Sequence, residues 1–125
     1  MKRCLALLIA SFALTAQAQC IKTDYQELKE FNEKELGAKF CSDKRDYDFN
    51  AQLVKVKRSA AATREALGDA RGQLRLLEEL EEADEDAKSC KSEMDRTLRL
   101  LAQRKVDEAT ASAQCPSLLA TVAAQ

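Results

Sequence analysis

The sequence predicts an all-α fold, a small up-and-down antiparallel helical bundle of four helices stapled by two disulfides. No stretch alternates apolar and polar residues as a half-buried strand does, and apolar residues instead recur at spacings of three or four. Helix breakers are scarce, since the chain has one proline and three glycines. Segments of helical length lie between four cysteines, Cys20, Cys41, Cys90 and Cys115.

Residues 1–18 have the pattern of a bacterial-type export signal. Lys2 and Arg3 precede an apolar run at 5–14, and a small-x-small cleavage site follows at 16–18. The run is too short to cross a bilayer, which takes about 20 residues. We therefore expect a cleaved signal peptide, no transmembrane segment after cleavage, and a periplasmic or secreted protein.

Cleavage would also remove Cys4 and leave an even number of cysteines. In an oxidising compartment such a set is typical of two disulfides in a small domain. We expect one disulfide-linked helical domain at 19–116, followed by a short apolar C-terminal tail at 117–125.

The four helices are expected at 22–40, 44–67, 70–88 and 91–114. Thr23 and Gln26 fit a capping box at the start of the first helix, and Ser42 or Asp43 fits the cap of the second. Pro116 stops the last one.

The segment from Gly68 to Gly72 separates two architectures. If it turns, the four-helix bundle results. The alternative is a long helical hairpin or coiled coil with one continuous helix through both glycines. It is favoured by a regular pattern of steps of three and four, Leu53, Val56, Ala60, Thr63, Leu67, Ala70, Leu74 and Leu77.

The bundle predicts how the cysteines pair. Cys41 and Cys90 would lie at one end and Cys20 and Cys115 at the other, and paired Cα atoms must approach within about 7 Å. The expected disulfides are therefore Cys20–Cys115 and Cys41–Cys90. In the continuous-helix alternative Cys41 and Cys90 cannot meet within one chain, so free or intermolecular thiols and a homodimer are expected.

The absence of histidine argues most strongly against an enzyme. Histidine-based triads and dyads and histidine-ligated metals need a residue that the chain lacks. The redox and zinc motif C-x-x-C and the acyl-transfer motif S-x-x-K are also missing. We expect no catalytic residues, no cofactor and no metal site.

Two charged segments remain. Seven of the nine residues at 78–86 are acidic, and a basic stripe follows a helical spacing through Lys57, Arg64, Arg71 and Arg75. The nearly balanced total charge argues against a nucleic-acid partner. We therefore expect an exported, non-enzymatic helical binding protein, an adaptor or inhibitor that contacts a protein partner, with the basic stripe as the candidate contact. The alternatives are a structural coiled-coil protein of the cell envelope and, third, an enzyme or redox protein.

Overall fold

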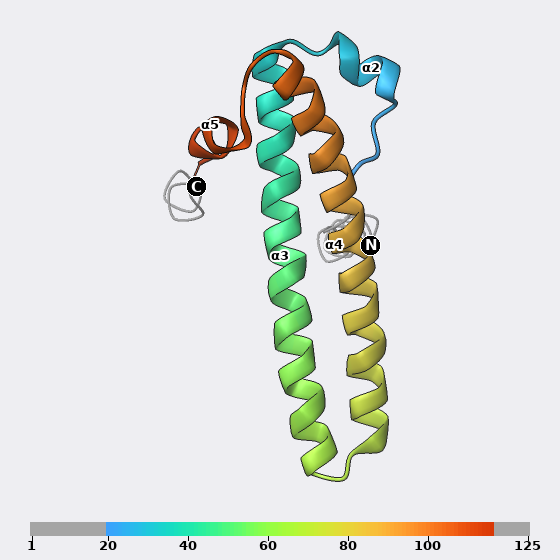
Figure 1. The fold of residues 1–125 in the computed structure, drawn as a ribbon. Helices are drawn as coiled ribbons and strands as arrows, with labels where there is room; N and C mark the ends of the chain where they lie inside the picture. The colour runs from blue at the N-terminus through green and yellow to red at the C-terminus, as the bar shows by residue number, and fades with distance from the viewer. Residues whose placement is uncertain (1–19, 117–125) are drawn as a thin grey trace, which may run out of the picture.

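The structure, a computed structural model, describes residues 20–116. Of these residues 82% are helical and none lies in a strand. Figure 1 shows four helices: α2 (Tyr25–Glu30), α3 (Glu33–Ala66), α4 (Ala70–Gln103) and α5 (Glu108–Ala113). The all-α fold class is confirmed. The expected signal peptide, 1–18, and the expected tail, 117–125, lie outside the described residues.

Two long antiparallel helices dominate the fold. α3 and α4 have 34 residues each, which corresponds to about 50 Å at 1.5 Å per residue. The expected helix boundaries at 40–44 and 88–91 are wrong, because both helices run through them. Ser42 and Asp43 cap no helix; they lie inside α3. The fold is therefore a long helical hairpin with two short helices at its open end.

α3 begins where the sequence offers a complete capping box. The Asn32 side chain accepts a hydrogen bond from the Glu35 backbone N–H at 2.8 Å, and the Glu35 carboxylate accepts one from the Asn32 N–H at 3.1 Å. The capping box expected at Thr23 does not form. Its backbone N–H instead donates to the Glu93 carboxylate at 3.5 Å.

A tight turn at 67–69 joins the two long helices. Gly68 has a φ of 74°, in the left-handed region that glycine tolerates best. The Gly68 and Asp69 N–H groups donate to the last carbonyls of α3, and the Asp69 side chain then caps α4 by accepting from Gly72 N–H. The turn expected at this segment is confirmed in its first half. The continuous helix through both glycines is wrong.

The helices meet along one seam of positions that repeat at steps of three and four, and every seam position down to Ala61 is buried or half-buried. On α3 the seam consists of residues 36, 40, 43, 47, 50, 54, 57, 61 and 64. On α4 it consists of residues 73, 76, 80, 83, 87, 90, 94, 97 and 101. In the half nearer the turn the seam mixes small and aliphatic side chains: Ala61 and Ala83 are buried, and Leu76 and Leu80 are half-buried.

The hydrophobic core lies at the open end, away from the turn. It consists of Leu28, Leu36, Phe40, Met94, Leu100, Leu101 and Ala111. These residues come from all four helices. The half of the hairpin nearer the turn, which we call the distal half (49–66 and 70–87), has no third layer among the described residues 20–116.

The two terminal segments cross back over the hairpin, and each is held by a disulfide. Cys20 bonds to Cys90 of α4, and Cys115 bonds to Cys41 of α3. The expected pairs, Cys20–Cys115 and Cys41–Cys90, are therefore wrong. They required Cys41 and Cys90 at helix ends, whereas both lie inside long helices and each meets a terminal segment there.

Candidate interaction surface

The hairpin has two broad faces, one on each side of the seam. In an antiparallel pair, residues directly before a seam position on both helices lie on one side, and residues directly after lie on the other. Lys39 and Glu93 both precede seam positions, and their ion pair at 3.4 Å confirms this assignment. We call the two sides the preceding face and the following face.

At the open end both faces are covered. The N-terminal segment crosses the preceding face, where Thr23 contacts Glu93. The C-terminal segment crosses the following face, where Cys115 is bonded to Cys41. In the distal half, no described residue covers either face. The candidate interaction surface is therefore the distal half.

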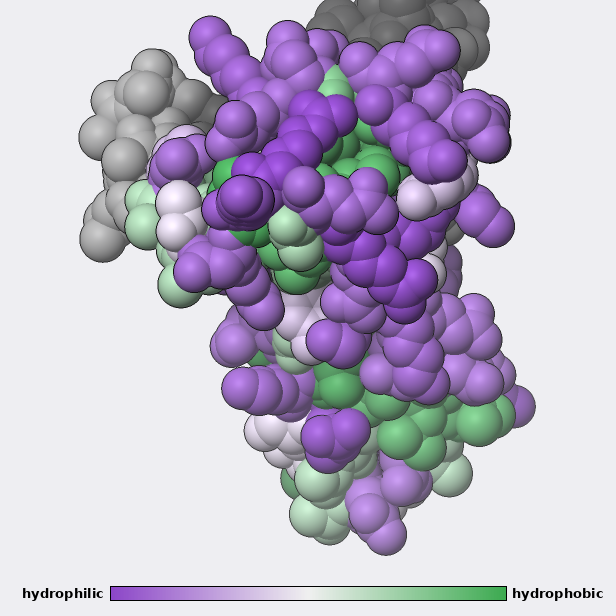
Figure 2. All heavy atoms as spheres, turned by 45° about the horizontal axis from the view of Figure 1, so that its top comes forward, coloured by the Kyte–Doolittle hydropathy of each residue, from purple (hydrophilic) through white to green (hydrophobic). Residues whose placement is uncertain are grey.

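An apolar stripe runs along α3 on the preceding face, from the start of the distal half toward the turn. Phe49 is 56% exposed and Val56 50% exposed, with the half-buried Leu53 between them. The stripe lies on the side turned away from the view in Figure 2, which instead shows hydrophobic side chains at the surface over α4, toward the turn. A stripe of this kind on a helix is typical of a surface that packs on another helix.

This stripe belongs to the regular pattern that the sequence shows from Leu53 onward. The pattern indicates a buried seam, but Val56, Thr63, Leu67, Leu74 and Leu77 are all exposed. The true seam of α3 has a weaker signal because polar residues occupy it, including Asp43, Asn50 and Lys57.

Acidic side chains of α4 flank the apolar stripe on the preceding face. They are Glu79, Glu82 and Asp86, from the acidic run at 78–86. Partial burial, with Glu82 and Glu85 nearby, raises the pKa of Asp86. The run stays helical throughout, and Lys57 and Lys88 each neutralise one of its carboxylates, at 2.7 and 3.1 Å.

The four residues of the expected basic stripe do not form a continuous surface. Lys57 lies in the seam and pairs with Glu79. Arg64 pairs with Asp69 at 3.5 Å, and Arg71 and Arg75 line a shallow hollow beside the same aspartate. The turn therefore gathers three arginines around Asp69 and separates them from Lys57.

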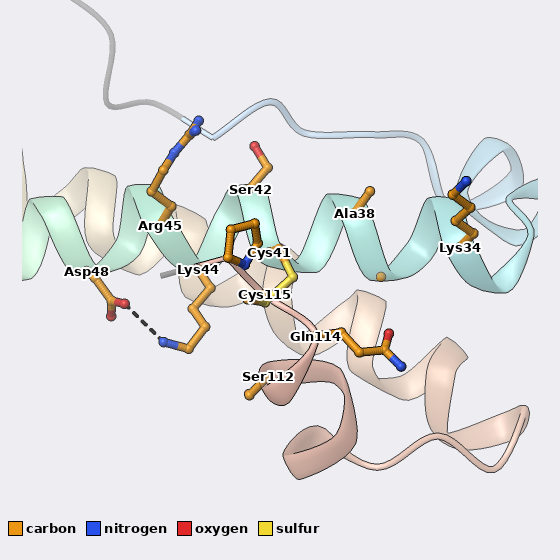
Figure 3. A pocket seen from close by; sticks show the side chains of 12 residues that line it. Lys34, Ala38, Cys41, Ser42, Lys44, Arg45, Asp48, Ser112, Gln114 and Cys115 are labelled. Atoms are coloured by element: carbon orange, nitrogen blue, oxygen red, sulfur yellow. Dashed lines mark hydrogen bonds and ion pairs between the residues drawn. A yellow bond between two sulfur atoms is a disulfide. The ribbon is translucent and has the colours of Figure 1, made fainter. Parts of the chain in front are cut away.

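A cleft of about 710 Å³ lies between α3 and the C-terminal segment. Its wall includes the Cys41–Cys115 disulfide. Figure 3 shows Arg45 on one side of α3 and Lys44 on the other, where Lys44 pairs with Asp48 at 3.0 Å. The charged side chains therefore do not converge on one point as they would around a bound anion.

A buried charge cluster holds the N-terminal segment against the long helices. Glu93, whose side chain is 3% exposed, pairs with Arg96 at 2.8 Å and with Lys39 at 3.4 Å. Lys39 also pairs with Asp43 at 2.8 Å and donates to the Ile21 carbonyl at 3.4 Å. Burial raises the pKa of Asp43, and Lys39 opposes that rise.

The buried polar atoms of this cluster all have hydrogen-bond partners. Within residues 20–116, no buried side-chain nitrogen or oxygen lacks a hydrogen-bond partner. No group of three carboxylate or thiol side chains in the same range is arranged to hold a metal ion. The cluster is therefore a structural joint between α3, α4 and the N-terminal segment.

No family model matches this chain, and neither a curated protein nor a solved structure is similar to it. Among the described helices, none has the length and apolar character needed to span a bilayer. The two disulfides indicate folding in an oxidising environment outside the cytosol.

Proposed function

We propose that the chain is an exported, non-enzymatic protein that binds a protein partner along the preceding face of its distal half. Export follows from the disulfides together with the signal-like residues 1–18, which we propose are cleaved on the way to the periplasm or the exterior. The lack of histidine in the whole chain supports a role without catalysis.

The observation that carries this proposal is the exposure of Phe49 and Val56 on a helix pair that no other described segment of the chain covers there. When a partner removes large apolar side chains from water, the free energy falls by about 25 cal/mol for each Å² of apolar surface buried. A helix laid along α3 would contact both side chains and Leu53 between them.

The charge of the same face limits the chemistry of the partner. Glu79, Glu82 and Asp86 lie beside the apolar stripe and leave a net negative flank. A helix with an apolar stripe and lysine or arginine along one edge would complement both features. The arginines at the turn, Arg71 and Arg75, would favour an acidic group at the end of that helix.

The proposal is tested by affinity capture from the periplasm of the source organism, comparing matched variants. Phe49→Ser and Val56→Ser remove apolar contacts from the preceding face, and Ala62→Ser, which introduces the same hydroxyl on the following face, is the control. We expect a partner that the wild type and Ala62→Ser retain and the first two variants lose. Retention by all variants, confirmed folded by circular dichroism, would refute binding at this face.

The two arginines at the turn are tested separately. Arg71→Glu and Arg75→Glu reverse charge at the turn without touching the apolar stripe. If the arginines contact an acidic end of the partner, capture weakens and the remaining binding becomes less sensitive to salt. Unchanged capture would assign the contact to the apolar stripe alone.

A further inference from the structure

The following face of the distal half is divided by charge between the two helices. On α3 it presents Lys55 and Arg58, both exposed. On α4 it presents Glu81 and Asp84. Among the described residues Lys55, Arg58 and Glu81 form no ion pair, whereas Asp84 pairs with Lys88 at 3.1 Å. Around Lys55 the α3 side of this face is thus basic and the α4 side acidic, whereas nearer the turn α3 also presents the exposed Glu65.

Residues equally far from the turn lie level with each other across the hairpin. Lys57 and Glu79, each the same distance in sequence from Gly68, form a direct ion pair at 2.7 Å. By the same rule Lys55 is level with Glu81, and Ala62 is level with Leu74. The two members of each pair lie on different helices, on the outer parts of the same face.

A two-fold axis parallel to the helices makes this face complementary to itself. Such an axis lays α3 of one copy against α4 of the other, antiparallel and at the same level. Lys55 of each copy then faces Glu81 of the other, and Ala62 faces Leu74. The helix dipoles are antiparallel across the contact as well.

The apolar residues of the face support the same arrangement. Leu74 is 59% exposed and Leu77 is 42% exposed, and both lie on α4 next to the acidic residues. Opposite Leu74 on a second copy would be the small side chain of Ala62, which lets the two helices approach closely. The contact would join two helix pairs, face to face, into a four-helix bundle.

We propose that the protein forms a homodimer through the following face of its distal half. The contact ends where the C-terminal segment begins to cover this face, since Lys44 and Asp48 line the cleft there. It leaves the preceding face free, so the dimer does not depend on the partner proposed above.

The division of charge allows a sharp test by sedimentation equilibrium over a wide range of concentration. An acidic variant, Lys55→Glu with Arg58→Glu, makes both halves negative. A basic variant, Glu81→Lys with Asp84→Lys, makes both halves positive. We expect each variant to dimerise about a hundredfold more weakly than the wild type, because like charges now face each other.

Mixing the two variants provides the decisive result. An acidic copy and a basic copy place opposite charges together on both sides of the axis, so an equimolar mixture should form a heterodimer at least as stable as the wild-type dimer. Added salt should weaken it. Phe49→Ser, on the preceding face, serves as the control and should dimerise like the wild type.

Three outcomes would overturn the proposal. They are a wild type that stays monomeric at every concentration, a dimer that both charge variants retain, and a mixture that forms no heterodimer. Circular dichroism of each variant distinguishes loss of association from loss of folding. Failure of the partner capture described above leaves this test unaffected, because the two surfaces lie on opposite faces.

Discussion

Lys57 of α3 and Glu79 of α4 form an ion pair across the seam, with Nζ and Oε2 2.7 Å apart, where the sequence pattern suggests only a basic stripe on the surface. The hydrogen bond from Lys57 lowers the pKa of Glu79 below its usual 4.5. The pair therefore links the two helices at a level where no other element within residues 20–116 packs on them.

Replacing Lys57 by methionine should raise the pKa of Glu79. A lowered pKa contributes stability above pH 4.5, and this contribution is lost as the pH falls through the folded-state value. Because both side chains are partly exposed, the loss at neutral pH should be at most about 1 kcal/mol. Carboxyl NMR measures the titration, and Lys55→Met should leave it unchanged.

The buried Asp43 should have the opposite dependence on pH. Its raised pKa means that the folded state binds the proton more tightly than the unfolded state does. Its contribution to stability is thus complete below pH 3.8 and is lost as the pH rises through the folded-state pKa. The difference in unfolding free energy between wild type and Asp43→Asn should therefore fall as the pH rises.

Urea unfolding between about pH 3 and pH 6 measures this difference. Asp48→Asn is the matched control, since Asp48 is exposed on the same helix and also pairs with a lysine at i−4. A difference that grows as the pH rises would contradict the assignment of Asp43 as a carboxyl whose burial outweighs its ion pair.

Each disulfide should be worth about 2 to 5 kcal/mol, because both close long loops. The sequence separations are 70 residues for Cys20–Cys90 and 74 for Cys41–Cys115. Changing either pair to serine should lower the free energy of unfolding by this amount. Limited proteolysis should then cleave first in the terminal segment that the missing disulfide held.

A peptide map under non-reducing conditions tests the pairing itself. It should contain one peptide pair that includes Cys20 with Cys90 and another that includes Cys41 with Cys115. Recovery of Cys41 linked to Cys90 would show that the helices break as the sequence pattern suggests.

Gly68→Ala should destabilise the protein by about 1 kcal/mol, because alanine tolerates the positive φ of this position poorly. Gly37 provides the control. It lies inside α3, and the nearest atom to an added Cβ would be Gln114 Oε1 at 4.0 Å. Gly37→Ala should therefore stabilise the helix by up to about 1 kcal/mol. Thermal unfolding measures both changes, and equal effects of the same sign would contradict this account.

Two phenylalanines on α3 should respond very differently to truncation. Phe40 is fully buried in the core at the open end, and Phe49 is 56% exposed. Phe40→Ala should cost about 3 to 5 kcal/mol. Phe49→Ala should cost less than about 1 kcal/mol, since solvent already contacts most of the ring. Chemical denaturation distinguishes the two, and a large loss at Phe49 would mean that something covers the preceding face.

The sequence predicts the class of the fold and its central turn well, because both follow from local chemistry. Few helix breakers and helical spacing are enough for the first, and Gly68 with Asp69 for the second. The Asn32 capping box was equally readable, but the competing pair Thr23 and Gln26 has the same pattern. Only the tertiary contact of Thr23 with Glu93 decides between them.

The seam between the helices could not be read from apolar spacing. On α3 the more apolar set of positions, with Leu53 and Val56, faces solvent, and the seam includes Asp43, Asn50 and Lys57. These polar residues are tolerated because they have charged partners: Lys39 of the same helix pairs with Asp43, and Glu79 of α4 pairs with Lys57. The disulfide pairing failed for a related reason, since it depended on helix ends that do not exist.

The disulfides also impose an order on maturation. An exported chain that emerges from its N-terminus presents Cys20 and Cys41 to the oxidant before Cys90. Closing the loop between these two costs less entropy because that loop is short. Neither native bond can close until most of α4 has followed. Correct oxidation thus requires that Cys20 and Cys41 stay unpaired until their native partners emerge, or that thiol–disulfide exchange later breaks a bond between them.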